Sequence, residues 1–252
     1  MQSAVTFAVF SAFIIYSTWA SYEAANFEYG PYLSPMYSPL LFGPSAHSWF
    51  GGPFQPEWWP GFLRYSPAVL ILWAPVGFRL TCYYYRGAYY KAFWADPPGC
   101  AVGEPRSNYR GERSFPLVIQ NIHRYFLYVA VVFIGILSYD AWLALWFPAD
   151  GSPVLQPGAP TEFGIGVGTI VLLLNAVFLG CYTFGCHSLR HLIGGVKDVL
   201  SGHPVRKSAY DCVSCLNRWH MKWAWVSLIW VGFTDLYVRM CAMGIWTDVR
   251  LF

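Results

Sequence analysis

Two stretches of the chain, residues 1–22 and residues 163–189, contain no Asp, Glu, Lys or Arg. Each is long enough for an α-helix to cross the hydrocarbon core of a bilayer, which takes roughly 20 residues. Charged residues make up only 12% of the whole chain, whereas globular domains have roughly 25%. A surface with so few charges would not stay dispersed in water. The sequence therefore predicts an integral membrane protein.

Five membrane-spanning helices are predicted, at about 4–21, 66–86, 122–148, 163–189 and 220–246. A cleaved signal peptide is the alternative for the first helix, but that stretch lacks the positively charged start that such peptides carry. The predicted fold class is an all-α integral membrane protein with one anchor domain over residues 1–252. It is a bundle of five helices with a long loop rich in aromatic residues and proline.

The distribution of basic residues predicts how the helices run. Thirteen of the sixteen Lys and Arg lie within 79–124 and 190–222, and positive residues favour the cytoplasmic side. Loops 87–121 and 190–219 are therefore predicted inside, with the N-terminus inside and the C-terminus outside. Loop 22–65 is then outside, where its many Pro, Gly, Tyr and Trp residues suit a packed cap at the headgroup layer. The basic stretches follow this topology and do not indicate nucleic-acid binding.

Histidines and cysteines collect at the predicted inner ends of the helices. Ionisable and ligating residues at membrane depth are costly and usually functional, so the set indicates a metal site; the alternative is that the histidines cap helices at headgroup level. No histidine lies in the outer half of the helices, which excludes two haems. One haem, zinc, or a [2Fe–2S] centre with two Cys and two His ligands stay open. The helix-end residues considered are Cys82, Cys186, His123, His187, His191 and His220, with Cys100, Cys212 and Cys215 in the inner loops.

Two further pairs carry chemical signals. Cys212 and Cys215 form a Cys-x-x-Cys, whose spacing suits two thiolates on one iron or zinc ion. Asp235 and Arg239 are four residues apart and share a helix face. An ion pair that shields both charges is the plainer interpretation of these two residues, and a proton path is the alternative.

Several motifs carry a resemblance to a known family. They are TCYYYR at 81–86, DPPGC at 96–100, NIHRYF at 121–126, GCHSLRHL at 185–192, LNRWHM at 216–221 and TDLYVR at 234–239. These resemble the membrane-anchor subunit of the haem-less succinate dehydrogenase, respiratory complex II, of mycobacteria and similar bacteria. The resemblance covers about residues 66–248.

The resemblance implies a complex in the bacterial cytoplasmic membrane. A flavoprotein oxidises succinate, an iron–sulfur subunit relays the electrons, and this anchor holds a Rieske-type [2Fe–2S] cluster and a quinone site. Four ligands are needed, but the family pattern offers six. Cys212 and Cys215 depart from that pattern. The metal ligands implied are Cys82, Cys100, Cys186, His187, His191 and His220.

Two imidazoles must reach the cluster from different directions. We therefore favour His220 with one of His187 and His191, while the other donates to the partner subunit, a carboxylate or quinone; His123 is the next candidate. Loop 87–121 is expected to form much of the seat for the iron–sulfur subunit. The quinone-binding residues expected at the inner helix ends are Tyr85, Arg86, Tyr89, His123, Arg124 and Trp219.

Two other functions remain open at this stage. One is a one-haem cytochrome b anchor of another membrane dehydrogenase, which would show a Soret band. The other is a non-redox transporter or channel that uses Asp235 and Arg239 and has no bound redox centre. The sequence does not determine the quinone type, the direction of the reaction or the oligomeric state.

Overall fold

The computed structural model describes residues 2–53, 55, 57–62, 65–93, 117–195 and 199–252. The helices are α1 (Gln2–Glu23), α2 (Pro67–Leu80), α3 (Tyr83–Phe93), α4 (His123–Leu143), α5 (Val167–Phe184), α6 (His187–Gly194), α7 (Pro204–Arg218) and α8 (His220–Ala242), with a 3-10 turn at Leu117–Ile122. The strands are β1 (Glu28–Tyr29), β2 (Tyr32–Leu33), β3 (Trp146–Pro148) and β4 (Thr161–Phe163).

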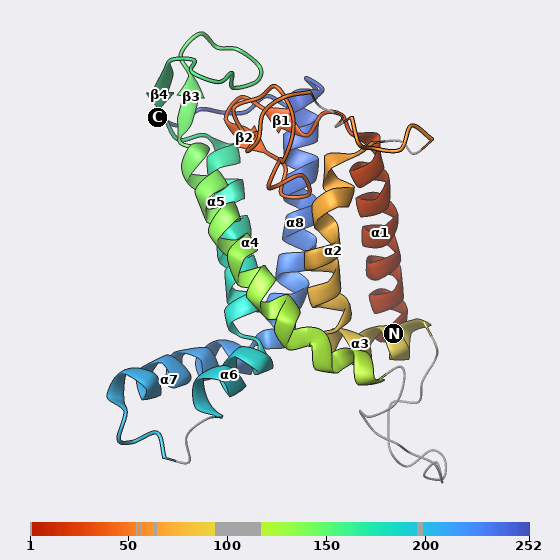
Figure 1. Ribbon diagram of the computed structural model, residues 1–252, viewed down its shortest axis with the longest axis vertical. Coiled ribbons are helices and arrows are strands. Elements are labelled where there is room, and N and C mark those ends of the chain that lie inside the picture. The colour runs from red at the N-terminus through yellow and green to blue at the C-terminus, as the bar shows by residue number, and fades with distance from the viewer. Residues whose placement is uncertain (1, 54, 56, 63–64, 94–116, 196–198) are drawn as a thin grey trace.

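The long helices α1, α2, α4, α5 and α8 lie side by side along the long axis of the molecule (Figure 1). Helices α3, α6 and α7 lie at one end, which we call the inner end after the predicted sidedness. Both antiparallel strand pairs, β1–β2 and β3–β4, lie at the other end, which we call the outer end. The N-terminus is at the inner end and the C-terminus at the outer end.

Three of these helices are long and apolar enough to cross a membrane: Ser3–Glu23, His123–Leu143 and Val167–Phe184. Helix α2 is apolar but has only 14 residues. Helix α8 has 23 residues and carries Lys222, Asp235 and Arg239. The protein is thus mostly helical with three candidate spans within the described residues. The count of five crossings stays a prediction.

Helix α4 shows how the sequence suits both a bundle and a lipid surface. Its buried residues recur at helical spacing, because His123, Leu127, Ala130, Leu137 and Ala141 fall on one face. The opposite face exposes large apolar and aromatic side chains. In water such a face would be unfavourable, but lipid solvates it. The exposed residues are Tyr125, Tyr128, Val132, Tyr139 and Trp142.

Two of the predicted spans are each split into two helices. The span predicted at 66–86 ends at Leu80, and α3 begins at Tyr83. The span predicted at 163–189 begins only at Val167, ends at Phe184, and is followed by a separate α6. Side-chain bonds lie at both breaks. At the first, the Thr81 hydroxyl bonds the Gly77 carbonyl at 2.7 Å and the His123 ring at 2.8 Å. At the second, Asn217 of α7 bonds the Gly185 carbonyl at 2.8 Å.

Other predicted bounds also shift. The span predicted at 122–148 ends at Leu143, because residues 146–148 pair with β4. The span predicted at 220–246 ends at Ala242. Residues 190–219, predicted as a loop, are largely helical, because α7 and the end of α6 have one apolar face each. Most of the loop 87–121 lies outside the described residues.

The segment between α1 and α2 is packed, with a buried core of its own. Tyr32, Leu33, Tyr37 and Leu40 are all 2% exposed or less. The Ser38 hydroxyl bonds the buried Asp140 carboxyl of α4, which ties this segment to the bundle. We call residues 24–53, 55 and 57–62 the cap; they close the outer end of the bundle.

Candidate metal centre

Four thiol and imidazole side chains from four different helix ends gather at the inner end of the bundle. Cys82 lies in the break between α2 and α3, and Cys186 in the break between α5 and α6. His123 is the first residue of α4, and His220 is the first residue of α8. Cys82 and Cys186 belong to the same buried cluster. We call these four residues the donor set.

The donor set is arranged as two thiol–imidazole pairs. His123 Nε2 lies 3.1 Å from the Cys186 sulfur, and His220 Nε2 lies 3.6 Å from the Cys82 sulfur. His220 Nδ1 is buried and has no hydrogen-bond partner among the described residues. Within the same ranges, no group of three or more His, Cys, Asp or Glu side chains is placed to hold a metal ion. The structure therefore brings two sulfur and two nitrogen donors together as two pairs.

Thr81 bonds the His123 ring on the side away from Cys186. Its hydroxyl lies 2.7 Å from the Gly77 carbonyl oxygen, to which it can donate its single proton. The same hydroxyl oxygen lies 2.8 Å from His123 Nδ1. When it donates to Gly77 it can accept from Nδ1, and the neutral ring then presents its Nε2 lone pair to Cys186. A ring nitrogen presented in this way is the form in which histidine binds metal ions.

Two aromatic rings connect the two pairs. Phe78 stacks on the His123 ring with centroids 4.6 Å apart, and Tyr182 stacks on the His220 ring at 5.0 Å. Phe78 and Tyr182 also touch each other edge to face at 5.5 Å. The buried Tyr182 hydroxyl has no hydrogen-bond partner in the part of the chain that the structure describes. The two rings orient both imidazoles and exclude water from them.

Arg79 places a positive charge beside these rings. Its guanidinium lies 4.7 Å from the Tyr182 ring centroid and donates to the Tyr85 hydroxyl at 2.5 Å and to Ser227 at 3.0 Å. The Tyr85 hydroxyl donates in turn to the Ala224 carbonyl at 2.5 Å. The sequence analysis assigned no role to Arg79. The signal that identifies it is a single charge inside an apolar run.

A cavity of about 370 Å³ extends from Arg79 and Tyr182 toward the outer end. Small-molecule sites typically have volumes of roughly 300–1,000 Å³. Ala130 and Leu137 of α4 line its middle, and Met36 of the cap lines its outer part. The walls are mainly apolar. The cavity is thus an apolar channel with a cationic group at its inner end, next to the rings that cover the donor set.

The structure separates the predicted metal ligands into groups. Cys82, Cys186 and His220 belong to the donor set, and His123 completes it. His187 and His191 form a different, exposed pair on α6, with their Nε2 atoms 3.0 Å apart. Helix α6 leaves the bundle sideways after the break at Cys186 (Figure 1). Cys100 lies outside the described residues, and Cys212 and Cys215 are exposed on α7.

The predicted quinone-binding residues are likewise divided. Tyr85 and His123 are buried beside Arg79 and the donor set. Arg124 and Trp219 are exposed at the inner end, where Lys222 lies over the Trp219 ring at 4.0 Å. The backbones of Arg86 and Tyr89 lie on α3, and their side chains lie outside the described part of the structure.

Comparisons with known proteins establish the family. A family model described as the actinobacterial succinate dehydrogenase subunit SdhC matches residues 1–244. The chain belongs to this family. SdhC is a membrane subunit of a bacterial succinate dehydrogenase, so the chain is part of an oxidoreductase. The resemblance stated from the sequence motifs is confirmed at this level.

A solved structure agrees with this assignment. The fold is similar to a chain of the Mycobacterium smegmatis Sdh1 complex in the apo form, with 38% identity and a TM-score of 0.83. The similarity covers 100% of this chain and 91% of that chain. A comparison with curated proteins finds no match.

Proposed function

We propose that this SdhC-family chain passes electrons from a cytoplasmic iron–sulfur subunit to quinone through a Rieske-type [2Fe–2S] cluster in the membrane. The observation that carries the proposal is the donor set: two thiols and two imidazoles from four helix ends at one end of the bundle, with Cys82, Cys186 and His123 buried and His220 half-buried. Cys₂His₂ is the ligand set of Rieske centres. The flavoprotein that oxidises succinate and the iron–sulfur subunit are the expected partners.

The residue types suit such a cluster. Cys82 and Cys186 would supply the two sulfurs, and His123 and His220 would supply the two nitrogens. A Rieske centre holds both histidines on one iron and both cysteines on the other, so the mixed Cys–His pairs seen here would have to rearrange to hold it. When bound, a centre of this kind carries one electron at a potential higher than that of an all-cysteine cluster. In this proposal His123 replaces the α6 histidine that the sequence analysis favoured as a ligand.

The residues around the donor set have distinct tasks in this proposal. Thr81 holds the Nδ1 proton of His123 and so keeps Nε2 available as a ligand. Phe78 and Tyr182 hold the two imidazole planes by stacking. Both thiols are almost fully buried, which keeps water and soluble oxidants away from them.

The cavity suits quinone, which has a polar headgroup and a long apolar tail. Arg79 and the unpartnered Tyr182 hydroxyl can donate hydrogen bonds to a headgroup oxygen at the inner end. The apolar walls along α4 suit the isoprenoid tail. Tyr85 accepts a hydrogen bond from Arg79, and His123 stacks on Phe78, so both lie next to residues that line this end. Their roles in binding quinone remain predictions. Roles for Arg86, Tyr89, Arg124 and Trp219 remain predictions for the same end of the bundle.

The inner end also suits the soluble partners. Most basic residues of the chain lie in the segments predicted inside, and α6 and α7 extend sideways beyond the bundle (Figure 1). We propose that this end carries the iron–sulfur subunit, together with loop 87–121.

The test compares His123→Ala and His220→Ala with the control His187→Ala/His191→Ala in the purified complex. Iron, acid-labile sulfide and the low-temperature paramagnetic spectrum are measured for each variant. We expect each donor-set variant to lose one [2Fe–2S] centre and quinone reduction. Succinate oxidation by a water-soluble dye should survive, because that dye accepts electrons upstream. The control should keep its cluster.

Other outcomes would contradict the proposal in specific ways. Loss of the cluster in the control but not in the donor-set variants would assign the ligands to α6. A Soret band in the unmodified complex would indicate a one-haem anchor. Zinc without additional acid-labile sulfide would indicate a structural metal site.

A further inference from the structure

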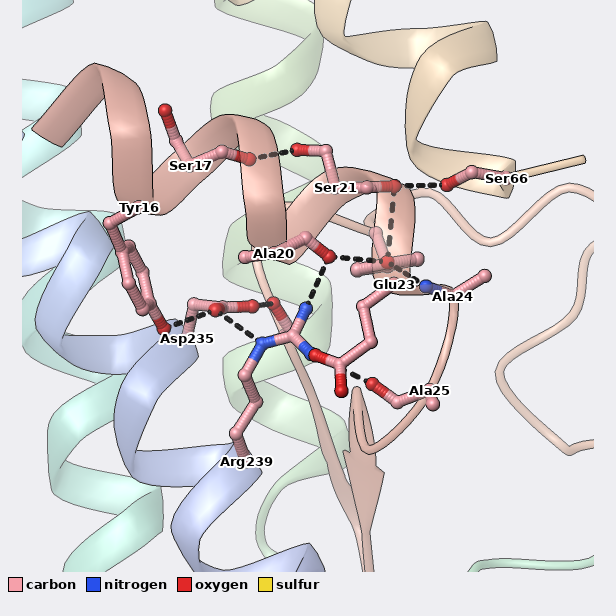
Figure 2. A network of polar contacts seen from close by, with 12 residues as sticks. Tyr16, Ser17, Ala20, Ser21, Glu23, Ala24, Ala25, Ser66, Asp235 and Arg239 are labelled. Atoms are coloured by element: carbon pink, nitrogen blue, oxygen red, sulfur yellow. Dashed lines mark hydrogen bonds and ion pairs between the residues drawn. The ribbon is translucent and has the colours of Figure 1, made fainter. Parts of the chain in front are cut away.

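A network of charged and polar groups joins α1 to α8 at the outer end (Figure 2). Arg239 is fully buried. It donates to Asp235 on its own helix at 2.7 Å and to Glu23 at the end of α1 at 2.9 Å. Its other terminal nitrogen donates to the Ala20 carbonyl of α1 at 2.6 Å. Asp235 in turn accepts from the Tyr16 hydroxyl of α1 at 2.6 Å.

The network satisfies groups that a helix end leaves unpaired. The last four carbonyls of any α-helix have no partner within the helix. In α1, the Ala20 carbonyl accepts from Arg239 and from the Tyr37 hydroxyl at 2.7 Å, and the Ser66 hydroxyl bonds the Ser21 carbonyl. The end of α1 is therefore fixed by α8, by the cap and by the residue before α2.

These bonds matter because α1 buries little of its surface. Only 11% of its apolar stretch is buried, against 50% for α5. The buried part includes Ala20 and Ser21 at its outer end, where Ala20 packs in a small apolar cluster with the cap. The polar bonds to α8 add to this small apolar contact and should contribute a large share of what holds the outer end of α1.

Helix α1 also forms one wall of the cavity. Phe13, Ser17 and Ser21 line it from the α1 side. Two large residues on its rim, Tyr22 of α1 and Trp73 of α2, are exposed. The cavity is thus open sideways beside the part of α1 that the network holds.

We propose that Arg239 is a positioning residue for the quinone tail, because it holds α1 against α8 and so sets the width of the cavity. The inference rests on the proposed quinone function of that cavity. The inference gives the buried Arg239–Asp235 ion pair a role beyond the mutual shielding of the two charges. We call the bonds of Arg239, Asp235, Tyr16 and Glu23 between α1 and α8 the clamp. The proposed headgroup site lies at the other end of the cavity. The clamp should therefore affect how a long quinone tail is held and leave the quinone headgroup unchanged.

The test uses Tyr16→Phe/Glu23→Ala in the assembled complex. This pair of changes removes the Tyr16–Asp235 and Glu23–Arg239 bonds between α1 and α8 but keeps the Arg239–Asp235 ion pair within α8. The matched control is Tyr237→Phe/Asp248→Asn, which removes one tyrosine hydroxyl and one carboxylate from another outer-end network, where these two side chains bond at 2.7 Å. Neither control residue lines the cavity.

Two readouts are measured: amide hydrogen exchange of α1, and KM and kcat for quinones with long and short tails. We expect faster exchange in the last turns of α1 and a KM for the long-tailed quinone raised roughly threefold to tenfold. The value of kcat and the KM for the short-tailed quinone should not change. The control should leave both KM values as in the unmodified complex.

The outcome that overturns the clamp is an unchanged ratio of the two KM values, even if the variant melts at a lower temperature. A separate variant, Ala130→Phe, fills the middle of the cavity and tests the proposed function itself. If it leaves the KM for the long-tailed quinone unchanged, the cavity does not hold the tail. If it raises that KM while the clamp variant does not, only the clamp proposal fails.

Discussion

The Thr81 hydroxyl makes two hydrogen bonds, one within its own helix and one to a histidine of the donor set. The hydroxyl bonds Gly77 within α2 and His123 at the start of α4. The first bond lies at the C-terminal end of α2. The second holds the His123 ring so that Nδ1 faces Thr81 and Nε2 faces Cys186. Polar partners behind a metal ligand commonly set both the orientation and the basicity of that ligand. Thr81 would act in this way on His123.

Thr81→Val tests this role, because valine keeps the shape and removes the hydroxyl. The His123 ring would then lose its acceptor at Nδ1, and we expect quinone reduction to fall by roughly 10- to 100-fold. The paramagnetic signal assigned to the donor set should shift, while dye reduction upstream stays normal. Thr81→Ser should restore both properties. Normal quinone reduction in Thr81→Val would show that the hydroxyl is dispensable.

His47 gives the cap a dependence on pH. It is buried, and neither ring nitrogen has a hydrogen-bond partner among the described residues, so burial lowers its pKa to about 4. In the unfolded chain the pKa of histidine is about 6.5. Between these values the unfolded state binds more protons, so the stability of the folded cap falls as the pH drops from 6.5 toward 4.

His47→Phe should remove this sensitivity to acid. The free energy of unfolding of both proteins is compared at pH 8 and pH 5 by thermal unfolding in detergent. The original protein should lose roughly 2 kcal/mol more between these pH values than the variant does. Burial raises the pKa of Glu28, so this residue makes the folded cap more stable as the pH falls. Glu28 is present in both proteins, so its effect cancels in the comparison. An equal loss of stability in both proteins would show that His47 does not titrate in this way.

At the scale of elements, the N-terminal end of α5 depends on residues far away in the chain. Asp248 accepts the Gly168 backbone N–H in the first turn of α5 at 2.9 Å and the Tyr237 hydroxyl at 2.7 Å. Its other oxygen accepts from the Tyr32 hydroxyl of the cap at 2.7 Å. A carboxylate at this position satisfies an unpaired N–H and interacts favourably with the helix dipole. It thereby joins α5, α8 and the cap.

Asp248→Ala should therefore destabilise the outer end. We expect a loss of about 1–3 kcal/mol in the free energy of unfolding, since a helix cap and acceptors for two tyrosine hydroxyls disappear together. Thermal unfolding of the purified protein measures the loss. Asp248→Asn keeps an acceptor oxygen and should lose less. A variant as stable as the original would contradict this role.

The sequence predicted the helices whose signal is local. Helix α5 lies within one stretch without charge, α1 covers the other and ends one residue beyond it at Glu23, and the apolar residues of α4 follow a helical period. The break at Thr81 and Cys82 was not predicted, because both residues are tolerated in helices and the bond that marks the break comes from His123, 42 positions later. The distances between helices that create the cavity are likewise absent from any local pattern.

The placement of the histidines shows the same limit. His187 and His191 are four residues apart, and this spacing places them on one face of a helix. That helix is α6, where both side chains are exposed, while His123 lies against the Cys186 sulfur. Their role as ligands stays a prediction. His123 is the first residue of α4 and points back toward the break at Cys186. Only the relative placement of α4, α5 and α6 distinguishes these histidines.

At the scale of the whole molecule, the outer end is assembled from segments that are synthesised at very different times. Gly30 pairs with Val154, and Gly166 pairs with Arg250, which follows all five long helices in the chain. A membrane protein is inserted from its N-terminus onward, so the early segments must wait beside the bilayer for partners that emerge much later. Their aromatic side chains can rest among the lipid headgroups during that interval. We therefore expect the pairing of Gly166 with Arg250 to form only after α8 is in place.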